Sequence, residues 1–331
     1  MNIDMDRRVI LKLAVMFAVA TKFDRVFAMD AAPGPAPVET GGATIKSAPN
    51  SDDRQNAWAL EHSSNFKAIF GNQKQEDAFL LFLANVYNIY PEDRFQRLLE
   101  EVSKTGNSDR EIYGQLQMRL PEIMPILSSV RYALPALARQ KAEMVRQTLV
   151  LLGSERKIKG YMEIGTPGRY LGRLRSNIEL TGDSVLLHSS KPRYSPTDIV
   201  ERGQPFKIGR FVSLNDYAPI ASDQVADQSL DVVTNFIGFH HSPPLKRDGF
   251  VQSLHRVLRP GGRLIVRDHD VNSSDMNRMV ALAHDVFNMG LGTDWSVNQQ
   301  EIRNFTSMRE IIGYIEGFGF KHAAQPPFPG G

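Results

Sequence analysis

The stretch from residue 161 to residue 270 constrains the fold more than any other part of this chain. A short apolar strand ends in Glu163 and passes through a glycine turn into a helix. A nearly continuous apolar run follows at residues 230–236, as expected for a central parallel strand that is covered on both faces. A Pro260-Gly261-Gly262 turn then leads into another strand. This order predicts a nucleotide-type α/β domain with a ligand at the bare glycine turn.

Three segments in this stretch carry a resemblance to a known family. They are Glu163-Ile164-Gly165 with Gly168-Arg169-Tyr170, Ser229-Leu230-Asp231-Val232-Val233, and Leu258-Arg259-Pro260-Gly261-Gly262-Arg263-Leu264. In this order they resemble the class I S-adenosylmethionine-dependent methyltransferases, over about the second half of the chain. The resemblance implies an α/β, Rossmann-like fold with a doubly wound, mostly parallel sheet. It also implies S-adenosylmethionine as the cofactor and in-line methyl transfer to a small molecule.

The glycine turn is the first part of the cofactor site that the resemblance implies. Glu163, Gly165 and Gly168 are its expected cofactor-binding residues. The family pattern has an acid followed by three alternating glycines, whereas Pro167 stands in the middle here and the turn is one residue shorter. Pro167 removes a donor and fixes φ, which affects contact with the methionine part of the cofactor. A tight strand-to-helix turn without a ligand stays an alternative.

The next two predicted strands, residues 184–188 and 211–214, supply the other expected cofactor contacts. His188 stands where the family normally places Asp or Glu, and a histidine cannot grip both ribose hydroxyls as a carboxylate does. Asn215 and Asp216 are expected near the adenine amino group. An ordinary turn is an equally open interpretation of this Asn-Asp pair.

Histidines and aspartates follow the fourth and fifth predicted strands. His240 and His241 come after the fourth, and Asp268, His269 and Asp270 come after the fifth. Ligands bind beyond the carboxyl ends of such strands, so we expect these side chains beside the methyl-transfer point. His240, His241, Asp268 and His269 are the predicted catalytic residues, with either His240 or His241 as a general base.

Two alternatives stay open for the same residues. They would suit a Mg, Mn or Zn ion or a proton relay, but no strict ligand spacing supports a metal, and we assign no metal ligand. Asp268 and Asp270 could instead cap the next helix.

A further segment is expected to lie over the fifth strand as a wall of the substrate site. Its polar and aromatic residues are His284, Asp285, Asn288, Trp295, Asn298 and Glu301. Trp295 could stack on a substrate ring or be a core aromatic. The chain then ends without an obvious apolar seventh strand, so we expect the family's antiparallel strand to be missing.

Helices are expected before the α/β domain. Residues 57–157 show apolar positions at helical spacing, broken by Pro91 and closed by Gly153, and the α/β domain is expected at residues 158–331. In the family such helices often cover the substrate or form a dimer contact, and packing for stability is an equally open interpretation. The sequence does not indicate the oligomeric state.

The N-terminus resembles a twin-arginine export signal. Arg7 and Arg8 precede an apolar run at residues 13–20, and Val26-Phe27-Ala28 offers small residues at a cleavage site. Residues 1–30 are thus a signal-like segment, and residues 31–56 a flexible linker. Export to the periplasm, with transient membrane contact, is the prediction. The cytoplasm, where S-adenosylmethionine is made, is the alternative.

Composition narrows the function classes. The 331 residues carry a formal charge of +2, so no broad basic field favours nucleic acid as a partner. The chain has no cysteine, which excludes disulfides, thiolate metal sites and a cysteine nucleophile. Two rivals to a methyltransferase remain. One is a non-catalytic exported binding protein on a degenerate methyltransferase fold. The other is a metal-dependent hydrolase, for which no G-x-S-x-G or H-E-x-x-H pattern is present.

Overall fold

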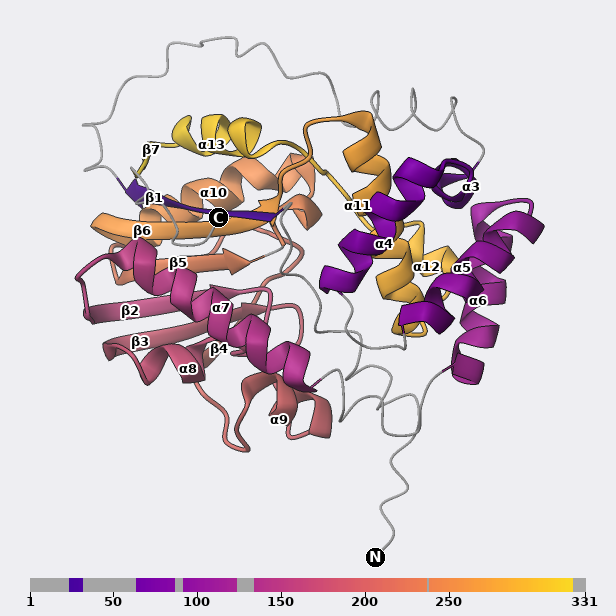
Figure 1. Cartoon of the computed structure of the whole chain (residues 1–331). Helices are drawn as coiled ribbons and strands as arrows, with labels where there is room; N and C mark the ends of the chain where they lie inside the picture. The colour runs from indigo at the N-terminus through magenta and orange to yellow at the C-terminus, as the bar shows by residue number, and fades with distance from the viewer. Residues whose placement is uncertain (1–23, 32–63, 87–91, 124–133, 237, 324–331) are drawn as a thin grey trace, which may run out of the picture.

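The computed structural model describes residues 24–31, 64–86, 92–123, 134–236 and 238–323. The twin-arginine pair, and nearly all of the predicted linker at residues 31–56, lie outside these ranges. An α/β part built around one sheet lies beside a part made of helices alone (Figure 1). None of the helices within the described ranges is long and apolar enough to cross a membrane.

A seven-stranded sheet of order β4-β3-β2-β5-β6-β1-β7 forms the α/β part. Its strands are β1 (Asp24–Ala31), β2 (Lys157–Ile164), β3 (Glu179–His188), β4 (Arg210–Ser213), β5 (Leu230–Phe236), β6 (Leu258–His269) and β7 (Phe320–His322). β2 to β6 pair in parallel, and β1 pairs antiparallel with both β6 and β7. The predicted doubly wound, mostly parallel sheet is confirmed.

Strand β1 corrects two expectations. It supplies, from the N-terminal end of the chain, the antiparallel strand that was expected to be missing. It pairs with β6 from Asp24 opposite His269 to Asp30 opposite Arg263, and Met29 is fully buried. The predicted cleavage residues therefore lie inside the sheet. The signal-like segment overlaps the folded domain at residues 24–30, and the α/β domain is not confined to residues 158–331.

Two layers of helices cover the faces of the sheet (Figure 1). They are α7 (Leu134–Leu152), α8 (Leu171–Arg175), α9 (Pro196–Arg202), α10 (Pro244–Val257) and α13 (Met308–Glu316). Successive side chains of a strand point to opposite faces. Thus Val185 and Leu187 of β3 join the core under α10 and α13, whereas Leu186 joins the core under α7 and α8. β5 is buried on both faces as well, with Val233 in the first core and Val232 and Phe236 in the second.

The helical part draws on two distant regions of the chain. Its helices are α3 (Asn65–Phe70), α4 (Gln73–Val86), α5 (Glu92–Thr105), α6 (Asp109–Ile123), α11 (Ser274–Gly290) and α12 (Trp295–Asn298). The first four and α11 share one apolar core. α6 continues through Pro121. The Tyr113 hydroxyl donates to the Thr293 carbonyl over 2.7 Å, and its ring lies 5.2 Å from that of Trp295. Trp295 is therefore a core aromatic.

Candidate functional site

The carboxyl edge of the sheet gathers the predicted cofactor residues from three neighbouring strands. The amide of Gly165, after β2, donates to the Leu187 carbonyl of β3 over 2.9 Å. The amide of Leu214, after β4, donates to the His188 carbonyl over 3.0 Å. We call this group of strand ends, from β2, β3 and β4, the turn side. The fold thus places Gly165, His188 and Asn215 along one edge.

Glu163 serves the turn itself. Its side chain is buried, and its carboxylate accepts hydrogen bonds from the Leu171 amide at 2.9 Å, from the Tyr170 amide at 3.3 Å and from the Thr166 hydroxyl. Burial raises the pKa of Glu163, and these three hydrogen bonds work in the opposite direction. The carboxylate holds the loop against the start of α8, so Glu163 shapes the turn and is not presented to a ligand.

The two predicted glycines of the turn have different surroundings. Gly165 has a φ of +85° and is exposed, with no heavy atom within 4 Å of an added Cβ. Gly168 has a φ of +96°, but an added Cβ would lie 3.1 Å from Ile208 and 3.4 Å from Leu186. Only Gly165 of this pair leaves its backbone open to an approaching ligand.

The loop after β4 is strained. Asn215, Asp216 and Tyr217 have φ values of +45°, +54° and +57°. A left-handed conformation costs a residue with a side chain about 1–2 kcal/mol, and such outliers cluster at functional sites. The Asp216 carboxylate lies 2.7 Å from the Lys246 ammonium of α10. Of the predicted pair, Asp216 is therefore engaged in an ion pair within the protein. The His188 ring contacts the Ser190 carbonyl at 2.8 Å.

Asn235, at the end of β5, is a residue that sequence reasoning missed. It pairs in register with Ile164 of β2. It is buried, and neither atom of its side-chain amide has a hydrogen-bond partner. Buried polar atoms are rarely left in this state without a ligand or a water molecule. The signal in the sequence was a single amide in the apolar run at residues 230–236.

Four predicted catalytic residues converge at the ends of β5 and β6. His240 and His241 lie on η2 (Phe239–His241), after β5, and Asp268 and His269 end β6. The Asp268 carboxylate lies 2.5 Å from Nδ1 of His240, and it accepts the His240 and His269 amides at 2.9 and 2.8 Å. Burial raises the pKa of Asp268 and holds the pKa of His240 well below its ordinary value. His240 is therefore a neutral ring with Nδ1 engaged.

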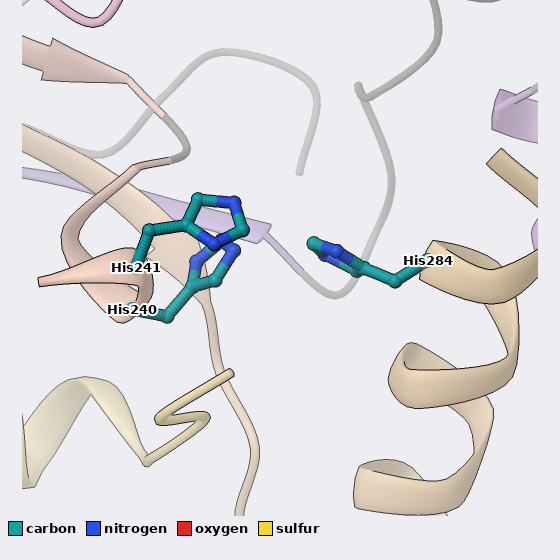
Figure 2. Close-up of side chains that lie close together, drawn as sticks. All are labelled: His240, His241 and His284. Carbon is teal, nitrogen blue, oxygen red and sulfur yellow. The ribbon is translucent and has the colours of Figure 1, made fainter. Parts of the chain in front are cut away.

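His284 of α11 completes this cluster from the helical part. Its ring points across to the rings of His240 and His241, with centroid distances of 5.1 and 5.6 Å (Figure 2). Its Nε2 lies 3.4 Å from Nε2 of His269. Phe305 packs against three of these rings, at 5.0 to 5.7 Å. We call the ends of β5 and β6 with η2 and His284 the histidine side.

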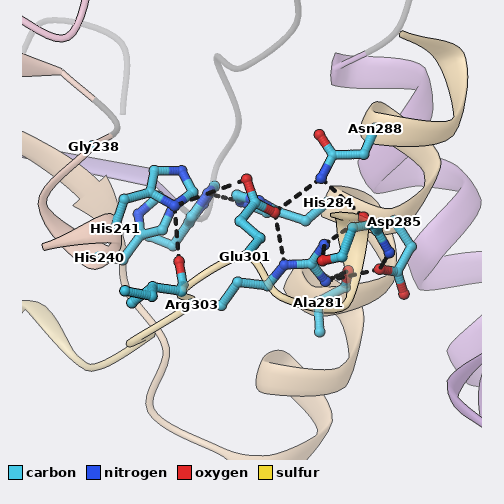
Figure 3. A network of polar contacts seen from close by, with 12 residues as sticks. Gly238, His240, His241, Ala281, His284, Asp285, Asn288, Glu301 and Arg303 are labelled. Carbon is cyan, nitrogen blue, oxygen red and sulfur yellow. Dashed lines mark hydrogen bonds and ion pairs between the residues drawn. The ribbon is translucent and has the colours of Figure 1, made fainter. Parts of the chain in front are cut away.

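The other predicted wall residues form a polar network behind His284 (Figure 3). Arg303 lies 2.8 Å from both Glu301 and Asp285, and Asn288 and Asn298 add further hydrogen bonds. Burial opposes ionisation of Glu301, but His284 and Arg303 hold its pKa well below the ordinary value. A hollow of about 420 Å³ is lined by Asn288, Asn298 and Glu301, among others.

Asp270 lies apart from this cluster. Its carboxylate accepts the Met308 amide at 3.0 Å, at the start of α13. The next helix, α11, has Ser273 as its N-cap, so the capping alternative is wrong for that helix. Asp270 instead binds the start of α13, and Asp268 binds His240. Another cavity, of about 220 Å³, lies at the opposite edge of the sheet beside the Pro260-Gly261-Gly262 turn. It contains none of the predicted site residues.

Part of the α/β region matches a known protein family. Residues 215–266 match the model of a family described as "Methyltransferase domain". This segment includes β5, η2, α10 and most of β6, and it begins after the glycine turn. No curated protein matches the chain.

Several solved structures are similar at low identity. The trans-methyltransferase CalH, in complex with SAH, is 14% identical, with 81% of this chain and 85% of that chain covered, at a TM-score of 0.42. The CurJ carbon methyltransferase is 13% identical, with coverages of 98% and 85%, at 0.42. An O-methyltransferase family protein from Burkholderia thailandensis is 18% identical, with coverages of 81% and 90%, at 0.38. Similarity at this level carries no argument about substrate or mechanism.

Two features, one on the turn side and one on the adjacent strand β5, fit the cofactor that the fold implies. The backbone at Gly165 is open, and the unpaired amide of Asn235 lies one strand away. Glu163 and Gly168 do not add to this fit, because both are used within the turn. The strand order and the matched segment together support a methyltransferase domain, with S-adenosylmethionine as its cofactor, in the α/β part of this chain.

Proposed function

We propose that this protein transfers a methyl group from S-adenosylmethionine to a small molecule. The observation that carries the proposal is the open backbone of Gly165 beside the unpaired amide of Asn235, at the carboxyl edge of a sheet with this strand order. Ligands of open α/β sheets bind at this edge. The cofactor supplies an electrophilic methyl group when it is bound.

The residues around this edge have distinct roles. Gly165, Asn215 and Asn235 contact the cofactor, and His188 is the polar group at the tip of β3. Glu163 keeps the turn in shape. His241 is the candidate general base, because its side chain is 29% exposed and its Nδ1 donates to the Ile302 carbonyl over 2.8 Å. That hydrogen bond leaves Nε2 as the atom that accepts a proton.

The substrate approaches between the two parts of the molecule. α11 carries His284 to the histidine side. The hollow of about 420 Å³ is lined by residues 288–301, and one of these, Glu301, lies 3.6 Å from His284. The size of this hollow fits a small acceptor. Positioning the acceptor against the methyl group supplies much of the rate acceleration in such transfers.

A non-catalytic binding protein on the same fold is the second candidate. The observation in its favour is that Glu163 is consumed inside the turn while His188 replaces the ribose-binding acid. This candidate predicts that S-adenosylmethionine does not bind.

Export stays a prediction. Arg7 and Arg8 lie outside the described residues, and a cut after Ala28 would divide β1. We propose that an exported form keeps the chain from Asp24 onward.

The substitution Asn235→Leu tests the proposed site. It replaces an unpaired buried amide by an apolar group of similar size, which should raise the free energy of unfolding by about 1 kcal/mol. It should also weaken S-adenosylhomocysteine binding at least tenfold in calorimetric titrations. Thr234→Val is the matched control on the same strand, because the Thr234 hydroxyl is 2.8 Å from the Tyr161 hydroxyl and so already has a partner. Unchanged affinity in Asn235→Leu would remove Asn235 from the cofactor site.

A further inference from the structure

We propose that His240, His241 and His284 bind one divalent transition-metal ion of the zinc class, with a fourth position open to an oxygen ligand. The rings come from two elements, η2 and α11, that are 43 residues apart at their nearest ligands, from His241 to His284. Figure 2 shows them pointing toward a common centre.

The spacing of the ligand atoms suits one ion. One nitrogen of each ring lies within 4.8 Å of the corresponding nitrogens of the other two. Zinc binds imidazole nitrogen at about 2.0–2.1 Å, so two ligands of a tetrahedral ion lie about 3.4 Å apart. Small rotations of exposed or half-buried rings cover the difference. Nε2 of His284 and Nε2 of His269 already lie 3.4 Å apart, which puts His269 beside the same centre.

Hydrogen bonds fix which nitrogen of two rings is free to bind a metal. Nδ1 of His241 faces the Ile302 carbonyl at 2.8 Å, and a carbonyl only accepts, so this Nδ1 carries the proton. Nδ1 of His240 faces the Asp268 carboxylate at 2.5 Å. In the neutral form of each ring, the lone pair is therefore on Nε2. Metal-binding histidines are oriented in this way, with the other nitrogen donating to a carboxylate or a carbonyl.

His284 has the same kind of support. Its Nδ1 lies 3.6 Å from the Glu301 carboxylate. Glu301 is in turn held by the Arg303 guanidinium at 2.8 Å and by the Asn288 amide at 2.9 Å (Figure 3). Nδ1 thus faces an acceptor in all three rings, at hydrogen-bond distance in His240 and His241 and at 3.6 Å in His284. A partly buried network keeps the third acceptor in place.

An unpaired atom at the centre argues against a histidine cluster that serves packing alone. Nε2 of His240 is buried and has no hydrogen-bond partner. Leaving a buried polar atom unpaired costs about 1–3 kcal/mol, and a protein retains such an atom where a ligand satisfies it. Phe305 packs against His240 and His284 at 5.0 Å, which lowers the polarity around the centre.

The donor set selects the class of ion. Imidazole nitrogen suits Zn, Cu, Fe and Ni, whereas Mg and Ca prefer oxygen. Three protein ligands with an open fourth position are typical of catalytic and not of structural zinc sites. The site lies on the histidine side of the edge where the cofactor is proposed, so an oxygen of the methyl acceptor is the ligand we assign to the open position. This last assignment rests on the proposed function, whereas the metal site does not. With an ion bound, Nε2 of His241 is a ligand, so the general-base role of His241 applies only to the metal-free protein.

The test is metal binding by the full chain, with the metal alone as the probe. Protein stripped with a chelator is titrated with Zn²⁺, and separately with Co²⁺ while its visible absorption is recorded. We expect one ion per chain and intense visible Co²⁺ bands of four- or five-fold coordination. His284→Gln should weaken Zn²⁺ binding at least 100-fold and remove the Co²⁺ bands. Its side chain is 13% exposed and glutamine is a polar residue of similar size, so the variant is expected to fold.

His322→Ala is the matched control. His322 is exposed on β7 and pairs with Met29 of β1. His269, beside the proposed centre, pairs with Asp24, five residues away on the same strand. His241→Gln is a second variant that leaves the buried His240 and Asp268 pair intact. Absence of stoichiometric Zn²⁺ binding by folded protein, or equal binding by His284→Gln and wild type, would overturn the proposal. Titration of S-adenosylhomocysteine into the stripped protein reports on the proposed function separately.

Discussion

The turn side and the histidine side of the same sheet edge differ in whether all of their buried polar groups have a hydrogen-bond partner. On the turn side, Glu163 accepts three hydrogen bonds within its own loop, and Arg169 makes a bidentate ion pair with Glu201 at 2.7 Å. Toward the histidine side, Asn235 and Nε2 of His240 are buried without a partner. Asp268 is as fully hydrogen-bonded on the histidine side as Glu163 is on the turn side. The two unpaired groups, Asn235 and Nε2 of His240, are what distinguish the histidine side.

The residues that match the family pattern are thus not the residues whose polar atoms lack a hydrogen-bond partner. The acid and the second glycine of the turn resemble the family most closely, yet both are used for shape. The unpaired atoms lie on strand ends that the glycine pattern does not name. Unsatisfied buried atoms are a physical mark of a ligand site, whereas a motif marks a local backbone path.

Deletion of β1 should have the largest effect, and it should act on the histidine side. β1 pairs with β6 up to His269 and Asp268 and buries Met29. Removing residues 1–31 should lower the free energy of unfolding by on the order of 5 kcal/mol, which is comparable to the whole stability of many domains. Removing residues 1–23 keeps the strand and is the control. Chemical unfolding, with hydrogen exchange of β6 and β3, measures both. Equal stability of the two deletions would show that β1 is not part of the folded sheet.

Glu163→Ala should come next and should act on the turn side. The variant leaves the Tyr170 and Leu171 amides and the Thr166 hydroxyl without their acceptor. Each hydrogen bond to a charged group contributes about 1.5–3 kcal/mol, so with the lower value for all three we expect a loss of about 4.5 kcal/mol in the free energy of unfolding.

Glu179→Ala is the matched control for this variant. Its carboxylate is half-exposed on β3, in an ion pair of 3.1 Å with Lys157, and an exposed pair contributes less than about 1 kcal/mol. If Glu163→Ala is as stable as this control and loses only cofactor affinity, the carboxylate is a ligand contact and the proposed contrast fails.

Lys141→Met probes a smaller, pH-dependent effect beneath the turn. Burial lowers the pKa of Lys141 to about 8, against the attraction of Glu201. Between pH 8 and the ordinary value near 10.5 the unfolded chain binds more protons, so the stability of the wild type rises with pH in this window. The variant should lack this rise.

At pH 7 the same variant should be more stable than the wild type by about 2 kcal/mol, since a charged buried group is removed and one hydrogen bond to the Val200 carbonyl is lost. Urea unfolding at pH 7, 8, 9 and 10 gives the difference, with the exposed Lys157→Met as control. A variant that is less stable, with a profile parallel to that of the wild type, would mean that the hydrogen bond outweighs the burial of charge.

Local patterns predicted the parallel core of the sheet well, because each strand there is an apolar run of its own. The bounds of β5 are those predicted, and the turn and the histidine tips lie in the expected order. Pairing between distant segments was not predictable in this way. β1 contains Val26-Phe27-Ala28, which suggested a cleavage site, and its place depends on edges of β6 and β7 more than 200 residues away.

The site was predicted in part for the same reason. His240, His241, Asp268 and His269 follow neighbouring strands, so topology alone brings them together. His284 was placed over the fifth strand, but its position opposite His240 depends on how α11 packs on the helical part. The sequence could not show that Glu163 binds the amides of its own turn. The same motif is compatible with a carboxylate that points into the loop and with one that points toward a ligand.

Calorimetric titration of S-adenosylmethionine and S-adenosylhomocysteine into the full chain tests the central proposal most directly, with Gly165→Ala and Gly153→Ala compared side by side. Both glycines have a positive φ, +85° and +63°, and open space around an added Cβ, so backbone strain should cost the two variants a similar 1 kcal/mol or so. Only Gly165 lies at the proposed cofactor site. We predict saturable binding by the wild type and by Gly153→Ala, and at least tenfold weaker binding by Gly165→Ala. Folded protein that binds neither compound at millimolar concentration, or equal binding by both variants, would contradict it.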